Sequence, residues 1–322
     1  MIFRLQFQPS NKVIMLNTSV HIGSLKIKNP ITVASGTAGY GEELSMFMDI
    51  SRLGAIFTKG LSLEPRAGNM SPRIVETPSG ILNSIGLQNV GIEEFLNEKL
   101  PFLLKKGATV IPNIAGRTID ENVELCRILT NTEGIDAVEL NVSCPNVKEG
   151  GIAFGRELSV FTKLIQKVRK FCNSVLIIKL SPNVSDITDF AYAAKEMGAD
   201  AISVVNTILA MKIDIKKGVP YFKGKVAGLS GPAIKPIAVR MVYEIFERVD
   251  IPIIGMGGIC NINDILEFMM AGATAISLGT INLVNPVAAI ECIEKYEQYL
   301  ISEKINNISE LVGVAHRNTM PH

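Results

Sequence analysis

Eight short apolar runs recur along the chain, and this repetition limits the possible folds more than any other feature. Each run is too short and too rich in β-branched residues for a helix, and it is continuous rather than alternating, which is typical of parallel strands buried on both faces. Most of the runs end in small or polar residues. They are Ile31–Gly36, Ala55–Gly60, Thr109–Ala115, Ala137–Cys144, Val175–Pro182, Ala201–Thr207, Ile251–Gly258 and Ala275–Thr280.

The segments between the runs carry helix signals. After Ser185, which we predict as an N-cap, apolar residues recur at helical spacing until Gly198, and a second helix is expected from about Asn263 to Gly272. The ends of these two helices and the strands that follow resemble each other, which indicates a repeated βα unit. Eight strands that alternate with helices predict an α/β fold of the (β/α)8 TIM-barrel class rather than a doubly wound sheet.

Two connections are long enough to hold structure of their own, Leu61 to about Gly107 and Ile208 to about Val249. Both follow the C-terminal ends of predicted strands, so we expect insertions at the C-terminal face of the barrel, where barrel enzymes build their sites. We expect one barrel domain over residues 17–310. Residues 1–16 are expected to be a disordered or additional extension, and residues 311–322 a C-terminal tail.

Charge and composition argue against several classes of function. The net charge of +1 provides no overall field for nucleic acid or an acidic membrane, and no apolar run reaches the roughly 18 residues that cross a bilayer. The N-terminal segment also lacks the pattern of a signal peptide. The five cysteines are widely spaced without a C-x-x-C pair, so we expect no disulfide framework, no metal site and a reducing, cytoplasmic location.

The predicted strand ends gather lysines and glycines. Lys59 and Lys179 lie inside otherwise apolar runs, and because a buried ammonium needs an anionic partner, they suggest a bound anion or an electron-rich ring. Gly257-Gly258 and Gly279-Thr280 follow the last two strands, whose loops bind phosphate in many barrels, and Gly231 could add another backbone donor. The alternative interpretation is solvated lysines and two tight turns.

Cys144 differs from the other four cysteines, which we interpret as small buried apolar residues. It lies in Asn141-Val-Ser-Cys-Pro-Asn146 at the predicted end of the fourth strand. The three histidines all lie near the termini, so a thiol nucleophile with a histidine base is not expected. A thiolate that accepts a proton fits better, since nearby lysines would lower its pKa. The charged segment Lys148-Glu-Gly-Gly151 suits a lid.

Asparagines occupy many of the remaining positions near the strand ends. An isolated asparagine usually forms a turn, but side-chain amides both donate and accept, so an array of them complements a ring with alternating N–H and C=O groups. Beside lysines that can bind a carboxylate, they suggest a small planar acid as substrate. The asparagines are Asn83, Asn89, Asn113, Asn141, Asn146 and Asn206.

At these residues the sequence resembles the dihydroorotate dehydrogenases, from about Asn17 to Pro286. The motifs that carry the resemblance are Asn83-Ser-Ile-Gly-Leu-Gln-Asn, Asn141-Val-Ser-Cys-Pro-Asn and Gly255-Met-Gly-Gly-Ile. The resemblance implies an FMN-dependent oxidation of dihydroorotate to orotate in pyrimidine synthesis. It implies that Cys144 is the catalytic base that removes the C5 proton while the C6 hydride passes to the flavin.

The resemblance also implies roles for the polar residues. Lys59 would lie between flavin and substrate, and Lys179 near the N1–O2 edge of the flavin. The implied substrate-binding residues are Lys59, Asn83, Ser84, Ile85, Gly86, Leu87, Asn141, Asn206 and Thr207. The implied FMN-binding residues are Ser35, Lys59, Gly60, Asn113, Asn141, Lys179, Val205, Gly231, Gly257, Gly258, Gly279 and Thr280.

Within that family, a cysteine base and the lack of a membrane helix resemble class 1. Segments 142–151 and 228–236 resemble its NAD-linked subgroup (class 1B), which implies a homodimer of this chain joined to a partner subunit that carries FAD and a 2Fe–2S cluster, commonly as a heterotetramer of two chains of each. This chain lacks the clustered cysteines that such a cluster needs. Three alternatives stay open: a fumarate-using class 1A-like homodimer, a flavin-free phosphate-binding lyase or isomerase, and a barrel that only binds.

Overall fold

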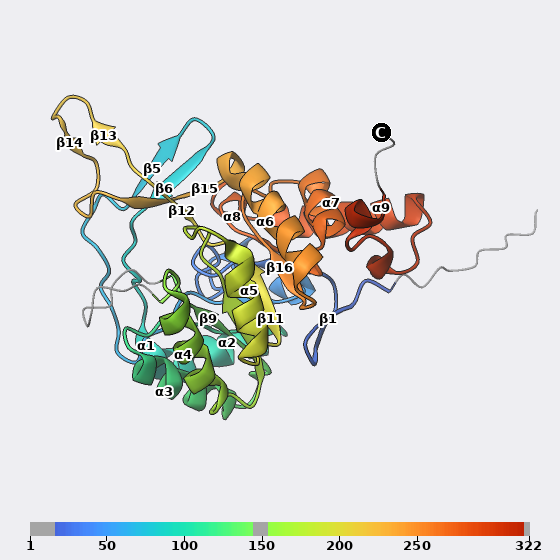
Figure 1. Ribbon diagram of the computed structural model, residues 1–322, viewed down its shortest axis with the longest axis horizontal. Helices are drawn as coiled ribbons and strands as arrows, with labels where there is room; N and C mark the ends of the chain where they lie inside the picture. Colours follow the sequence, from blue (N-terminus) through green and yellow to red (C-terminus); the bar gives the residue numbers. More distant parts are fainter. Residues whose placement is uncertain (1–16, 144–153, 319–322) are drawn as a thin grey trace, which may run out of the picture.

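The computed structural model describes residues 17–143 and 154–318, in which helices surround a set of central strands (Figure 1). The pairing order of these strands forms a ring. Around the ring, every neighbouring pair of strands is parallel, which confirms the predicted barrel. The strands are β3 (Ile31–Val33), β4 (Ile56–Phe57), β7 (Val110–Ile111), β8 (Asn113–Ile114), β9 (Ala137–Asn141), β10 (Val175–Lys179), β11 (Ala201–Val204), β16 (Ile253–Gly255) and β17 (Ala275–Leu278).

The ring closes at Pro112. This residue separates β7 from β8, which together form the third predicted strand, and proline has no N–H to donate to the ladder. β7 pairs with β4 and β8 pairs with β9, while the carbonyl of Pro112 accepts a hydrogen bond from the backbone of Glu139 at 2.8 Å. Nine strand segments therefore form a barrel of eight strand positions.

The strands end earlier than predicted on the side of the cavity described below. For example, the second predicted strand was Ala55–Gly60, but β4 ends at Phe57. The backbone N–H of Lys59 instead donates to the carbonyl of Gly39 at 2.8 Å. Lys59 is thus held by a loop contact above the sheet, whereas Asn113, Asn141 and Lys179 still belong to strands.

Helices surround the ring. Asn261 and Asp264 form a capping box at the start of α7, as expected for a helix at this position, whereas Asp186 caps α5 in place of the predicted Ser185 because its carboxylate reaches the backbone N–H of Thr188. The helices are α1 (Gly91–Glu94), α2 (Leu100–Lys105), α3 (Ile119–Thr130), α4 (Leu158–Arg169), α5 (Ile187–Glu196), α6 (Lys235–Arg248), α7 (Ile262–Ala271), α8 (Ile281–Val284), α9 (Ala288–Ser302) and α10 (Val314–Arg317).

Shorter helical segments complete the shell. A π-helical turn, η3 (Phe95–Lys99), joins α1 to α2. The connections that the structure describes contain the 3-10 turns η1 (Leu44–Met46), η2 (Ile50–Arg52), η4 (Pro232–Ile234) and η5 (Ile308–Glu310).

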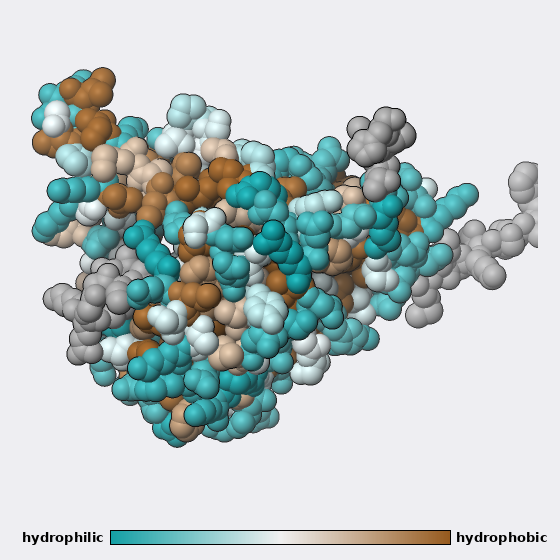
Figure 2. Space-filling model, viewed as in Figure 1, coloured by the Kyte–Doolittle hydropathy of each residue, from teal (hydrophilic) through white to brown (hydrophobic). Residues whose placement is uncertain are grey.

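The two long connections combine into one antiparallel sheet. It contains β5 (Ile74–Thr77), β6 (Gly80–Asn83), β12 (Ile208–Ala210) and β15 (Ala227–Ser230), in the order β12-β15-β6-β5 (Figure 1). The hairpin of β13 (Ile213–Asp214) and β14 (Val219–Pro220) extends from it. The insertions were predicted, but their pairing with each other was not. Figure 2 shows apolar surface over this hairpin and the adjoining sheet.

The opposite end of the barrel carries the hairpin of β1 (Val20–Ile22) and β2 (Leu25–Ile27). The segment predicted as a C-terminal tail packs on the helical shell as far as it is described: the ring of His316 stacks on Tyr243 of α6, with the centroids 3.7 Å apart. The domain boundaries themselves stay predictions. In residues 17–143 and 154–318, no helix combines the length and apolar character needed to span a membrane.

Candidate active site

A cavity of about 860 Å³ opens at the C-terminal ends of the barrel strands. Its wall includes residues of the inserted sheet, among them Ile81 of β6 and Gly228 of β15. Cavities of roughly 300–1,000 Å³ are typical of small-molecule and cofactor sites. The insertions therefore wall a cavity at the end of the barrel where sites of this fold are found.

Strand register arranges the interior side chains in layers of four, taken from alternate strands. Gly255 marks the outward-facing positions, because a Cβ there would lie 2.7 Å from Phe268 of α7. Asn113 pairs with Glu139, and Glu139 pairs with Ile177. Because barrel strands are tilted, a layer moves forward by two residues on every second strand. The layer that contains Asn113 therefore contains Lys179 on β10, two residues beyond Ile177. Repeating this step around the ring gives one complete layer: Ala34, Asn113, Lys179 and Met256.

This layer is the floor of the cavity, since all four of its side chains line it. The layer above comes from the other strands, those that alternate with the strands of the floor. It also lines the cavity and consists of Lys59, Asn141, Val205 and Gly279. The layer below is fully buried and does not line the cavity; it consists of Phe57, Glu139, Ser203 and Ser277. The predicted strand-end residues thus lie in and above the floor.

Lys179 is already paired within the protein. Its Nζ donates to the Oγ of Ser35 at 3.0 Å and lies 3.7 Å from Oε2 of the buried Glu139. The sequence suggests a bound anion or an electron-rich ring beside both lysines. For Lys179 the anionic partner that burial requires is already supplied by Glu139, and its contact with a bound ring stays a prediction.

Lys59 has a different environment. It lies half-buried in the cavity wall, and burial lowers the pKa of its ammonium, with Arg73 acting in the same direction and Glu43 in the opposite one. Within the described part of the chain, its ammonium makes no hydrogen bond and no ion pair. A cation in this state favours an anionic ligand.

Amide side chains surround the same space. Nδ2 of Asn206 donates to Oδ1 of Asn141 at 3.3 Å, and Nδ2 of Asn83 donates to the carbonyl of Gly228 at 3.2 Å. After Asn83 the chain turns through a left-handed residue at Leu87, with a φ of 55°. This turn keeps the segment 83–87 along the cavity wall.

Glycines form the part of the wall after the last two strands. A Cβ on Gly258, where φ is 77°, would lie 2.8 Å from the carbonyl oxygen of Gly231 and 2.9 Å from the backbone N of Lys235. Gly279 has more room, since its nearest contact would be Ala34 at 3.8 Å. Backbone N–H groups at such glycines can approach phosphate oxygens closely.

Most of the predicted site residues lie together in the wall. They are Ser35, Lys59, Gly60, Asn83, Ser84, Ile85, Gly86, Leu87, Asn113, Asn141, Lys179, Val205, Asn206, Thr207, Gly257, Gly258, Gly279 and Thr280. Gly231 is not among the lining residues, although its neighbour Ser230 is, so its contact with a cofactor stays a prediction. Cys144 and the predicted lid over 148–151 lie outside the described residues.

Two residues of this region were missed from the sequence. Asn183 lines the cavity, donates to the carbonyl of Thr207 at 3.0 Å and accepts from the backbone of Leu209 at 2.8 Å, so it fixes the loop after β11. Its position after a strand, in Ser181-Pro-Asn183, was an available signal. Glu139 was missed because a single acid within an apolar run looks like an exposed edge position.

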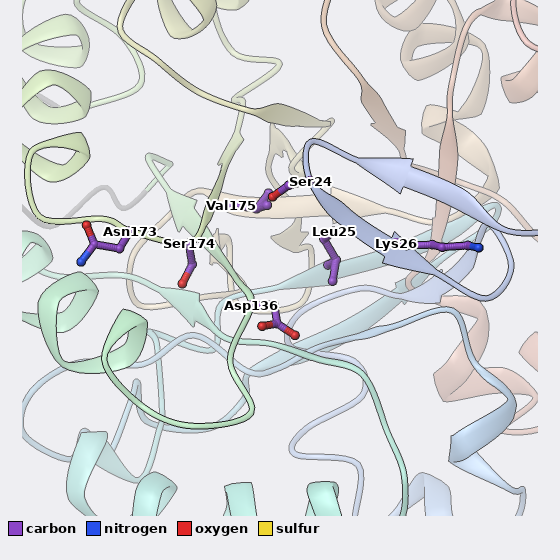
Figure 3. Close-up of a pocket in the computed structure, with 7 residues that line it drawn as sticks. All are labelled: Ser24, Leu25, Lys26, Asp136, Asn173, Ser174 and Val175. Atoms are coloured by element: carbon purple, nitrogen blue, oxygen red, sulfur yellow. The ribbon is translucent and has the colours of Figure 1, made fainter.

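A second hollow, of about 440 Å³, lies at the opposite end of the barrel (Figure 3). It is lined by Ser24, Leu25, Lys26, Asp136, Asn173, Ser174 and Val175. In Figure 3 the side chain of Lys26 extends away from Asp136, and among the described residues no second cation lines the hollow. The convergence of lysines, amides and glycines favours the larger cavity as the site of chemistry.

Comparison with known proteins agrees with this placement. The chain matches the family profile described as dihydroorotate dehydrogenase over residues 15–300. It is similar to the protein named dihydroorotate dehydrogenase B (NAD(+)), catalytic subunit, from Desulforamulus reducens, with 51% identity over 301 residues that cover 94% of this chain and 99% of the relative. Proteins of the same name from Caldicellulosiruptor bescii and Petrotoga mobilis are 51% and 50% identical over 298 and 300 residues, covering 92% and 93% of this chain and 99% and 100% of the relatives.

The family match extends over most of the chain, and the relatives align along nearly their whole lengths. The cavity, its two lysines and its amide-rich wall all fall inside the matched region. The chain belongs to the dihydroorotate dehydrogenase family.

Proposed function

We propose that this chain oxidises dihydroorotate to orotate in pyrimidine synthesis, with FMN in the cavity as the hydride acceptor. The observation that carries the proposal is the half-buried ammonium of Lys59, which has no partner in the described residues and lies one layer above a floor that contains the paired Lys179. Such an arrangement suits a small anion stacked above an electron-accepting ring.

The residues of the floor and wall fit a flavin. Oδ1 of Asn113 is fully buried and has no hydrogen-bond partner in the described part of the chain, so an N–H at a ring edge would satisfy it. Gly60 allows close approach, because a Cβ there would lie 2.9 Å from this oxygen. Gly257, Gly258, Gly279 and Thr280 would hold the phosphate. When bound, FMN supplies a two-electron acceptor for hydride.

Other residues would act on the substrate. The ammonium of Lys59 would pair with the carboxylate of dihydroorotate, and the amides of Asn83, Asn141 and Asn206 would hydrogen-bond its ring. Cys144, through the motif it shares with the family, would accept the C5 proton. The lysine and the amides would together fix the orientation of the dihydroorotate ring, so that one face is placed for loss of the hydride.

We infer that the electrons continue to NAD through a partner subunit. Support comes from the relatives, each of which is named the catalytic subunit of an NAD(+) enzyme. The partner would carry FAD and a 2Fe–2S cluster in a heterotetramer built on a homodimer of this chain. Purified chain that turns over fumarate by itself would instead identify the homodimeric class.

The direct test is anaerobic mixing of the FMN-loaded chain with dihydroorotate while the flavin absorbance is followed. Rapid bleaching is expected, and NAD should be reduced only after the partner is added. Lys26→Met is a matched control, since Lys26 lies at the other end of the barrel and should leave bleaching unchanged. A chain that lacks flavin yet binds a phosphorylated sugar would favour a lyase or isomerase.

A further inference from the structure

A carboxylate lies directly under the floor of the cavity. Glu139, on β9, has no exposed surface and belongs to the interior layer with Phe57, Ser203 and Ser277. Such layers in barrels usually consist of bulky branched side chains, and a buried carboxylate is expensive unless it is paired. Its presence here requires a reason beyond packing.

Both close contacts of Glu139 are made to the floor. Its Oε2 accepts a hydrogen bond from Nδ2 of Asn113 and lies 3.7 Å from Nζ of Lys179. Its Oε1 has no partner among the described residues, and neither do the hydroxyls of Ser203 and Ser277 in the same layer. The carboxylate therefore interacts with the groups that face the cavity rather than with its own layer.

The contact with Asn113 determines which atom of that amide the cavity receives. Because Nδ2 donates downward to Glu139, Oδ1 is the atom left for a ligand, and it is buried without a partner in the described structure. A neutral side chain at position 139 that donates as well as accepts would remove this constraint.

The contact with Lys179 determines the charge of the floor. Lys179 is nearly fully buried, with Ser35 and Glu139 as its polar neighbours, so one positive and one negative charge lie together in a poorly screened interior. Without the carboxylate, the floor would carry an uncompensated positive charge.

We propose that Glu139 is a positioning residue that sets the reduction potential of the bound flavin, by orienting the amide of Asn113 and by offsetting the charge of Lys179. This inference rests on the proposed function, because it requires a flavin above the floor. Reduction adds negative charge to the flavin ring, so a floor with less negative charge favours the reduced state. Glu139 accordingly keeps the potential lower than Lys179 alone would.

The test is the midpoint potential of the FMN-loaded chain, measured by spectroelectrochemistry without substrate. Glu139→Gln keeps the shape and removes the charge, and it should shift the oxidised-to-reduced equilibrium at least tenfold toward reduced flavin, which is about 30 mV for a two-electron couple. Ser203→Ala, in the same layer and without a charge, should leave the potential unchanged.

A purely structural ion pair gives a different result. In that case Glu139→Gln lowers the thermal midpoint while the potential stays at the wild-type value, and this outcome overturns the proposal. If Glu139→Gln does not fold, Glu139→Asp replaces it: the shorter side chain withdraws the charge from Asn113 and Lys179, and a shift of about twofold, roughly 9 mV, is expected in the same direction. No shift in that variant overturns the proposal as well.

The two proposals can fail separately. Flavin that is reduced at the electrode but not by dihydroorotate contradicts the proposed function and leaves the comparison of potentials valid. Equal potentials in wild type and Glu139→Gln, with normal bleaching by dihydroorotate, contradict only the role of Glu139. A folded chain that takes up no flavin contradicts both.

Discussion

The two ends of the barrel are formed by the same strands, but they differ in how their charged side chains are paired. At the amino ends, Arg169 pairs with Asp200 at 2.8 Å, and the same carboxylate oxygen accepts the backbone N–H of Leu176 at 2.8 Å. At the carboxyl ends, Lys179 is paired with Glu139, but the ammonium of Lys59 finds no partner in the described residues.

This difference distinguishes charges that stabilise the fold through pairs within the protein from charges that are available to bind a ligand. A half-buried cation without a partner destabilises the folded chain, so it persists where a ligand provides the missing interaction. Within the part of the chain that the structure describes, the hollow at the amino end is lined by neither a second cation nor a cluster of amides (Figure 3). Changes at the carboxyl end should therefore affect binding and rate, and changes at the amino end should affect stability alone.

The largest effect is expected from Cys144→Ala. Loss of a general base typically slows proton removal by about 10²–10⁴-fold, so the variant should retain FMN and bleach that much more slowly with dihydroorotate at neutral pH. Stopped-flow absorbance measures the rate. Cys292→Ala, which changes a cysteine buried on α9, should bleach at the wild-type rate. A near-normal rate for Cys144→Ala would remove this residue from the chemistry.

Lys59→Met should weaken the binding of orotate by roughly 10–100-fold, the range for loss of a charge-assisted hydrogen bond. Because burial lowers the pKa of Lys59 below its ordinary value of 10.5, wild-type affinity should decline as the pH rises through that lowered pKa. Titrations of flavin absorbance with orotate from neutral to alkaline pH measure both effects. If the variant keeps the same alkaline decline, another group binds the anion.

The same lowered pKa affects the stability of the ligand-free chain in the opposite direction: affinity for orotate falls as the pH rises, whereas stability increases. A lowered pKa means that the folded chain disfavours the ammonium, so without ligand Lys59 destabilises the fold at neutral pH, and this penalty is relieved as the pH rises toward 10.5. In denaturant unfolding without ligand, Lys59→Met should be more stable than the wild type at neutral pH. The two free energies of unfolding should converge in alkali.

A pair of glycine substitutions compares the two ends directly. Gly258→Ala forces a Cβ to 2.8 Å from the carbonyl of Gly231, and Gly23→Ala, in the β1–β2 turn, forces one to 2.9 Å from Cβ of Asp200. Both have positive φ, so each should destabilise the chain by about 1–3 kcal/mol. Only Gly258→Ala should also weaken the binding of FMN, by about tenfold in Kd, as measured by flavin fluorescence. Equal FMN affinities would place the phosphate elsewhere.

Much of this contrast could be predicted from the sequence. A strand buried on both faces is apolar along most of its length, so lysines and asparagines at the ends of such runs stand out, and parallel strands bring those ends to one face. Lys59, Asn141 and Lys179, which this reasoning singles out, all line the cavity. The roles assigned to them stay predictions.

Other features depend on partners that local patterns do not specify. The pairing of β6 with β15 joins Leu82 to Leu229 across a long stretch of chain, and neither strand has a strong signal of its own. The pairing of Glu139 with Lys179 depends on which residues share a barrel layer, which follows from register and not from composition. Cap positions differ by one residue, as for Asp186 in place of Ser185, because either side chain is suitable.

The smallest effect is expected from Asp200→Ala at the amino end. The variant loses the ion pair with Arg169, which keeps the carbonyls of Gly198 and Ser174 as acceptors. It also removes the acceptor of the backbone N–H of the buried Leu176, so stability should fall by about 1–2 kcal/mol. The unfolding midpoint in denaturant measures this loss, with Lys26→Met as an unaffected neighbour. FMN affinity and the bleaching rate should stay at wild-type values, because no layer of the cavity contains Asp200. A changed rate would mean that strain at the amino end reaches the floor through β10 and β11, and the division between the two ends would then fail.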